Sequence, residues 1–200
     1  MWAIVTDGSI TKIINQPKPL VIGDVRHSKN IFSFRWSNEE REAIGIYEVV
    51  FDNTNKKDEK YYTNTNQTFA FAGGAVTASY GSATAKALAD TLFTAQDEVD
   101  GKGTEGEVAS KGLKSQHKEK IKQEASGLLT NYDWYVIRKA DAGTAVPSAI
   151  TTYRAGVRTK SGEMETLIDA CSTVDELAAL YVYNNADPRV RPLGEFPEAV

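Results

Sequence analysis

The sequence has few of the residues on which enzymes and metal sites depend. Its 200 residues include one cysteine, Cys171, and two histidines, His27 and His117. A single cysteine excludes an internal disulfide framework, and the apolar helical context of Cys171 predicts a small buried side chain. His27 falls in a polar loop and His117 on a highly charged helical face, so we expect both rings to be solvated. These residues predict no catalytic set.

Motifs for metal, phosphate or nucleophile chemistry are also missing. The sequence has no HxxH, HExxH or CxxC spacing for zinc and no GxSxG elbow. The run from Gly101 to Gly106 lacks a preceding apolar strand and a GK[ST] ending, so it does not predict a phosphate loop. The oxygen-rich stretch from Asp52 to Asp58 lacks the central glycine and final glutamate of a calcium loop. Carboxylates that meet from distant positions stay open as an alternative. We predict a protein that is not an enzyme and has no metal or cofactor.

Neither an excess of basic charge nor a long apolar run is present. The formal net charge is −4 and the pI is near 5.3, whereas phosphate-backbone binding usually needs a basic face. No run approaches the roughly 18 apolar residues of a membrane span, and the first residues lack the basic and apolar regions of a secretory signal. We expect a folded protein that is made in a cytoplasm and binds neither nucleic acid nor membrane.

What the sequence does contain is a β-rich first part, predicted as a domain over residues 1–81. Asp7-Gly8 and Gly73-Gly74 suit tight hairpin turns, and Ser37 with Glu40 forms a capping box for a helix over 38–44 that Gly45 ends. Alternating apolar residues favour an antiparallel meander with one wet face. The expected strands are 2–5, 10–14, 31–34, 46–51, 61–63, 68–71 and 76–80.

From residue 82 the apolar spacing becomes helical. Segment 82–106 is predicted as a helix over 83–99 followed by a glycine-rich hinge, and 107–183 as a helical domain. The stretch from Lys114 to Lys122 is charged almost all round, which is typical of a helix that is solvated or finds its partner in another chain. The tail 184–200 contains three prolines and is expected to be extended. The predicted class is α+β. The helices are expected at 107–129, 134–142, from Pro147 to Cys171, and from Thr173 to Tyr181.

Aromatic residues on neighbouring predicted strands form one candidate interaction surface. They offer rings on which sugars or bases could stack, but without interleaved lysine and arginine the nucleic-acid interpretation is weak. Core packing with cross-strand aromatic pairs is the alternative. The residues are Tyr61, Tyr62, Phe69, Phe71 and Tyr80.

A second candidate is a structural corner between helices. Asp133 is expected to cap a helix that Gly143 closes, and Trp134 to fill the joint between consecutive helices. Arg154 and Arg158 lie one turn apart on one helix face, so one of them is expected to pair with Asp133 or with a helix C-terminus. The full set is Asp133, Trp134, Arg138, Tyr153, Arg154 and Arg158.

The stretch that carries this corner resembles a known signature. Leu128 to Trp134 reads LLTNYDW, followed by Arg138, Pro147, Tyr153-Arg154 and Arg158. It resembles the C-terminal part of the tailed-phage tail-fibre-assembly and tail-assembly-chaperone families, with Tyr132 where those proteins have threonine. The opening MWAIVTDGSITKII is similar to the N-terminal hairpin of phage tail-associated proteins, and the layout, including YYTN and DAGTAVPS, to uncharacterised marine phage proteins.

The resemblance implies a structural component of a tailed-phage virion at the tail, the baseplate or the tail-fibre attachment. Its partners would be other phage tail or fibre proteins, and it would form a homo-oligomer, as most such components are symmetric. One alternative is a tail or tail-fibre assembly chaperone that is not retained in the virion. Another is a carbohydrate-binding module on the aromatic strands.

Overall fold

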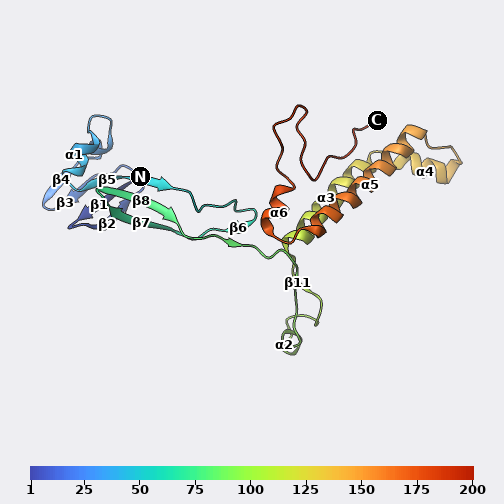
Figure 1. Ribbon diagram of the computed structural model, residues 1–200, viewed down its shortest axis with the longest axis horizontal. Helices are drawn as coiled ribbons and strands as arrows, with labels where there is room; N and C mark the ends of the chain where they lie inside the picture. The colour runs from blue at the N-terminus through green and yellow to red at the C-terminus, as the bar shows by residue number, and fades with distance from the viewer. The chain divides into compact units, whose positions relative to one another are not determined.

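The computed structural model describes residues 1–200 and divides into two compact units, Met1–Thr84 and Ala85–Val200 (Figure 1). The first unit holds the sheet and the second holds the long helices, so the predicted α+β class is confirmed. The division between units falls at 84/85. Segment 82–106 was predicted as a helix followed by a glycine-rich hinge, and its residues 85–106 are part of the second unit.

A five-stranded sheet organises the first unit, in the order β2-β1-β5-β8-β7. Its neighbours pair antiparallel except β5 and β8, which are parallel. The two edge strands, β2 and β7, contact each other, so the sheet is curled. The strands are β1 (Trp2–Thr6), β2 (Ser9–Ile14), β5 (Ile46–Asp52), β7 (Gln67–Ala72) and β8 (Ala75–Tyr80).

Both predicted hairpin turns are present. Asp7 and Gly8 have φ of 51° and 75°, and Gly73 and Gly74 have φ of 58° and 78°. Two successive positive φ values match the right-handed twist of the paired strands. The turns therefore set the registers of β1 with β2 and of β7 with β8.

Residues 15–45 cover one face of the sheet. They contain the paired strands β3 (Leu20–Ile22) and β4 (Val25–His27) and the helix α1 (Asn38–Glu42), which begins with the predicted capping box. The predicted strand 31–34 is wrong, because Lys29–Phe32 is a 3-10 helix (η1). Ile31 and Phe32 are consecutive and both buried in the same apolar cluster, whereas successive residues of a strand point to opposite faces. Arg41 Nη1 donates to the carbonyls of Ile31, Ser33 and Trp36 and ties this segment together.

The sheet is buried on both faces near β1. Ala3 and Ile4 belong to different apolar clusters because successive strand residues point to opposite faces. Ile4 packs with Ile14 and Ile46 beneath residues 20–32, and Ala3 packs with Val49, Val76 and Ala78. Two further strands near the end of this unit have two residues each, β6 (Tyr62–Thr63) and β9 (Thr84–Ala85).

The second unit opens with a hairpin in place of the predicted helix 83–99. β10 (Thr91–Leu92) pairs with β11 (Val108–Ser110), and only α2 (Ala95–Val99) between them is helical. The carbonyls of Ala87 and Leu88 instead accept from the amides of Leu113 and Lys114. Their backbone groups are therefore used outside any local helix.

The predicted glycine-rich hinge is a folded loop of this hairpin. The amide of Phe93 donates to the Glu107 carbonyl at 2.9 Å, and the amide of Gly106 donates to the Phe93 carbonyl at 3.0 Å. A Cβ at Gly103 would lie 2.3 Å from the Phe93 ring. Gly103 allows this close packing, and Gly101 and Gly106 adopt positive φ. The prediction of a hinge is therefore corrected.

Four helices follow: α3 (Leu113–Thr130), α4 (Asp133–Ala142), α5 (Ser148–Ala170) and α6 (Val174–Ala179). α3 and α5 lie side by side (Figure 1). The tail 184–200 has no helix or strand, as expected, but it is packed on the helices. Leu193 is fully buried and its amide donates to the Leu180 carbonyl at 3.0 Å, while Phe196 packs against Tyr153 and Val157.

Candidate interaction site at the helical corner

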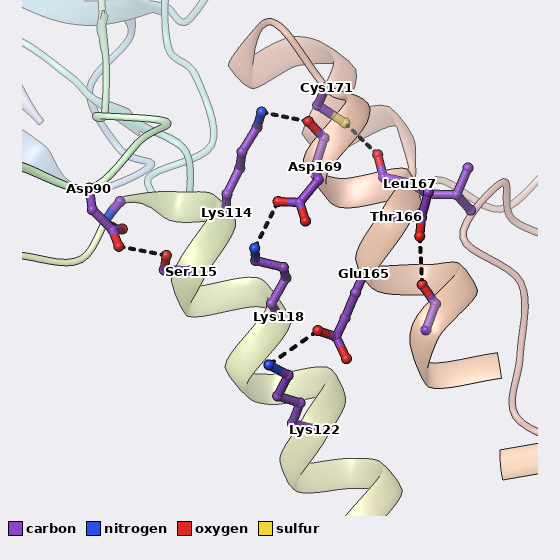
Figure 2. Close-up of polar contacts among 12 residues, drawn as sticks. Asp90, Lys114, Ser115, Lys118, Lys122, Glu165, Thr166, Leu167, Asp169 and Cys171 are labelled. Atoms are coloured by element: carbon purple, nitrogen blue, oxygen red, sulfur yellow. Dashed lines mark hydrogen bonds and ion pairs between the residues drawn. The ribbon is translucent and has the colours of Figure 1, made fainter. Parts of the chain in front are cut away.

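Lysines of α3 hold it against α5. Lys118 Nζ lies 2.8 Å from a carboxylate oxygen of Asp169, and Lys114 Nζ donates to the Asp169 carbonyl at 2.8 Å. One turn further on, Lys122 Nζ lies 3.2 Å from Glu165 (Figure 2). The sequence predicted that this charged stretch would be solvated or would pair with another chain. Its partner is α5 of the same chain, because the acids of α5 match the lysine spacing of α3.

Asp90 caps the start of α3 from outside the helix. Its carboxylate accepts from the Ser115 hydroxyl at 2.8 Å (Figure 2). It also accepts from the Gly112 amide at 2.7 Å. These bonds, first from Ser115 and then from Gly112, lower the pKa of the Asp90 carboxyl below its ordinary value. The helix itself has no side-chain cap at Gly112, so the cap comes from 22 residues earlier in the chain. Sequence patterns, which read local caps, did not indicate it.

Arg154 joins three helices at the corner. Its side chain is about nine-tenths buried, and Nη1 lies 2.8 Å from Asp133 Oδ1 and 2.7 Å from the Leu129 carbonyl at the end of α3. The structure thus makes both of the contacts that the spacing suggested for an arginine of α5. Tyr153 packs edge-on against Tyr132, with ring centroids 5.0 Å apart. α3, the start of α4 and α5 are held together at this point.

Two expectations about the corner are corrected. Asp133 is the first residue of α4 and not its cap, which is Tyr132 and makes no side-chain capping bond. Its carboxylate is free for Arg154 because it lies one position inside the helix. Trp134 fills no joint, since it is 58% exposed, and the Arg138 guanidinium lies 4.5 Å from its ring centroid. Gly143 closes α4 with φ of 69°, as predicted.

α4 presents an apolar surface to solvent. None of its ten residues is buried. Trp134, Val136 and Ile137 are 58%, 43% and 65% exposed. A soluble helix normally buries an apolar stripe, so this helix exposes the side chains that it would be expected to cover.

Two hollows meet beside α4. One, of about 450 Å³, lies between α3 and α5 and is bordered by Asp133. The other, of about 340 Å³, lies between α4, the α4–α5 connection and α5. Arg154 and Arg158 line both. Of the six predicted corner residues, the structure therefore brings Asp133, Arg154 and Arg158 together at one place.

The aromatic residues of the first unit do not form an exposed platform. Tyr61 is buried, and Phe69 and Phe71 pack against the cluster of Ala3, Val76 and Ala78. Tyr80 pairs with Gln67 in the β7–β8 register, which places it on this same inner face. Lysines cover three rings, with Lys56 over Tyr80, Lys57 over Tyr62 and Lys60 over Tyr61. The candidate surface Tyr61, Tyr62, Phe69, Phe71 and Tyr80 is thus largely core-facing or covered.

The scarce reactive residues occupy structural positions. His117 is 2% exposed, and its Nδ1 lies 2.7 Å from the Tyr181 hydroxyl, so the expectation of a solvated ring is corrected. It faces inward because it lies one turn before Ile121 on the buried face of α3. Cys171 is buried as predicted, and burial raises the pKa of its thiol. His27 is half-buried in β4, 6.4 Å from the Trp36 ring.

No group of three or more His, Cys, Asp or Glu side chains is arranged to hold a metal ion. None of the helices combines the length and apolar character of a membrane span. The chain matches no family model, and neither a curated protein nor a solved structure is significantly similar to it.

Proposed function

We propose that the protein is a non-enzymatic structural component of a tailed-phage virion, at the tail, baseplate or tail-fibre attachment. It works through protein–protein contacts with other tail or fibre proteins and forms a homo-oligomer. The observation that supports this most is the exposure of three large apolar side chains on α4, Trp134, Val136 and Ile137, with Trp134 and Ile137 on one face. The resemblance of residues 128–158 to phage tail-assembly families is the reason for proposing a phage tail as the assembly.

The length of α4 strengthens the argument for a protein partner. Isolated helices shorter than roughly 12–15 residues are marginal in water, and most helical stability comes from packing of an apolar face. α4 has ten residues and buries none of them. The Asp133–Arg154 ion pair joins the first turn of α4 to α5, so the exposed apolar side chains lie on a helix that is anchored at its N-terminal end. Tryptophan is among the residue types enriched at the centres of protein–protein interfaces.

The test is the protein composition of purified particles. We expect mass spectrometry to find the chain in particles of the phage that encodes it, at a constant ratio to the tail proteins. Absence from particles would overturn the proposal. If the absent chain co-purified with fibre protein from infected cells, the assembly-chaperone function would replace it.

A matched pair of variants tests the role of α4 in the same particles. The double variant Trp134→Ala/Ile137→Ser is expected to reduce incorporation at least about tenfold, since a central apolar anchor contributes on the order of 2 kcal/mol or more. Val99→Ser is the control, because Val99 is 81% exposed on α2, away from the corner. Equal incorporation of both variants would remove α4 from the proposal.

A further inference from the structure

The two hollows beside α4 differ in character. The hollow between α3 and α5 has hydroxyl and charged walls, including Ser126, Thr130 and Ser161. The hollow on the other side is lined by Val136, Ala145 and Val146 together with Thr151 and Lys139. Arg154 and Arg158 line both hollows, so a polar and a more apolar subsite adjoin across two arginines.

The charges of the polar hollow do not balance. Three cations line it, Lys122, Arg154 and Arg158, against two carboxylates, Asp133 and Glu165. Asp133 is paired with Arg154 and Glu165 with Lys122. Arg158 has no ion pair, and its hydrogen bond is a long one of 3.4 Å to the Arg154 carbonyl. One guanidinium at the junction of the hollows is therefore left with donors for a carboxylate.

We infer that the junction is a binding site for an acidic side chain followed by an apolar side chain, both from a segment of a partner protein. The carboxylate accepts two parallel hydrogen bonds from Arg158, a geometry that the guanidinium fork favours. The apolar side chain enters the second hollow against Val136 and Val146. This inference rests on the proposed function, because it takes the partner to be a protein.

The openness of the site favours a protein segment over a small molecule. Sites for small ligands enclose most of the ligand surface, whereas both hollows here are open to solvent. They also adjoin the helix that exposes Trp134 and Ile137. Asp133 of α4 borders the first hollow, and Val136 and Lys139 border the second, so a partner segment that packs on α4 lies beside both.

The experiment is an NMR titration of the ¹⁵N-labelled full chain with N-acetyl-Glu-Leu-amide, and with N-acetyl-Gln-Leu-amide as the matched peptide. We expect saturable shifts at amides that line both hollows. The Gln peptide is expected to bind about tenfold more weakly, because a charge-assisted hydrogen bond is lost. Arg158→Gln is expected to weaken the Glu peptide by a similar factor. Arg26→Gln, on exposed β4 in the other unit, is the control and should leave the titration unchanged.

Three results would overturn the inference: no shifts at the hollows, equal shifts with the two peptides, or the same shifts with sodium acetate alone. The peptide pair keeps the test valid even if Arg158→Gln alters folding, since both peptides meet the unmodified chain. If the chain is found in particles but shows no Glu-dependent shifts, the proposed virion role stands and the inferred binding site is wrong. If the chain is missing from particles but shows Glu-dependent shifts, the binding site stands and the proposed virion role is wrong.

Discussion

At the scale of single residues, Arg154 is the side chain that decides how the helices meet. Its Nη1 bonds to the Leu129 carbonyl and to Asp133 from a nearly buried position. Arg158 has the same chemistry one turn later, without an ion pair. Substituting each arginine in turn therefore compares the effect of a buried, paired cation on stability with that of an unpaired one.

Arg154→Met is expected to lower the free energy of unfolding by about 2 kcal/mol, because it leaves a helix-end carbonyl and a half-exposed carboxylate without their partner. Arg158→Met is the matched control and is expected to change it by less than about 0.5 kcal/mol. Urea unfolding followed by circular dichroism measures both. Equal effects of the two substitutions would contradict the role of Arg154 as the joint.

Asp90 supplies a pH-dependent contribution to stability. Its folded-state pKa is lowered by the Ser115 hydroxyl and the Gly112 amide. A lowered carboxyl pKa stabilises the fold above the unfolded-state value, about 3.9, and this contribution is lost as the pH falls through the folded-state pKa. Asp90→Asn is therefore expected to lower the melting temperature at pH 7 and to have a much smaller effect at pH 2–3. Asp141→Asn, in the exposed last turn of α4, is the control, and a drop of the same size there would contradict the capping role.

At the scale of elements, the start of α3 depends on a close approach of two backbone segments. The carbonyls of Ala87 and Leu88 and the Asp90 carboxylate accept from the first amides of the helix. They can do so because Gly112 has no side chain; a Cβ there would lie 2.2 Å from the Ala89 carbonyl oxygen. Segment 87–90 is thereby kept out of a helix and used as a cap.

Gly112→Ala is expected to destabilise the protein by about 1–3 kcal/mol, because the backbone of residues 88–89 must move away. Gly127→Ala lies in the same helix with nothing within 4 Å of its Cβ position. That control is expected to stabilise by roughly 0.5–1 kcal/mol through helix propensity. Thermal unfolding of the two variants checks the opposite signs, and a stabilising Gly112→Ala would contradict the close approach.

At the scale of the whole molecule, each unit is closed by parts distant in sequence. In the first unit, β5 and β8 pair in parallel between two hairpins. In the second, the C-terminal tail completes the core of the helices, with Leu193 fully buried and Phe196 against Tyr153. The tail is therefore a structural layer of its unit, although it has no regular secondary structure.

Leu193→Ala is expected to cost about 2–4 kcal/mol, the range for a large-to-small change in a packed core. Val190→Ala is the control, because Val190 is 53% exposed in the same tail, and should be nearly neutral. Urea unfolding followed by far-ultraviolet circular dichroism measures the helical unit. A neutral Leu193→Ala would show that the tail does not contribute to the core.

The sequence by itself determined the features that need only a few adjacent residues. The turns at Asp7-Gly8 and Gly73-Gly74, the capping box at Ser37, and the helix end at Gly143 all lie where they were predicted. Each depends on backbone φ or on hydrogen bonds within one turn, which local residue types set directly.

Only the tertiary structure decided features that depend on distant partners. The helical spacing of residues 83–92 was overridden because their backbone groups bond to β11 and to the start of α3. His117 is buried against Tyr181. Of the candidate aromatic surface, Phe69, Phe71 and Tyr80 face inward because of the register of β7 and β8. At the corner, the spacing of Arg154 and Arg158 indicated a shared helix face, but the fold selected which one meets Asp133 and left the other at the junction of two hollows.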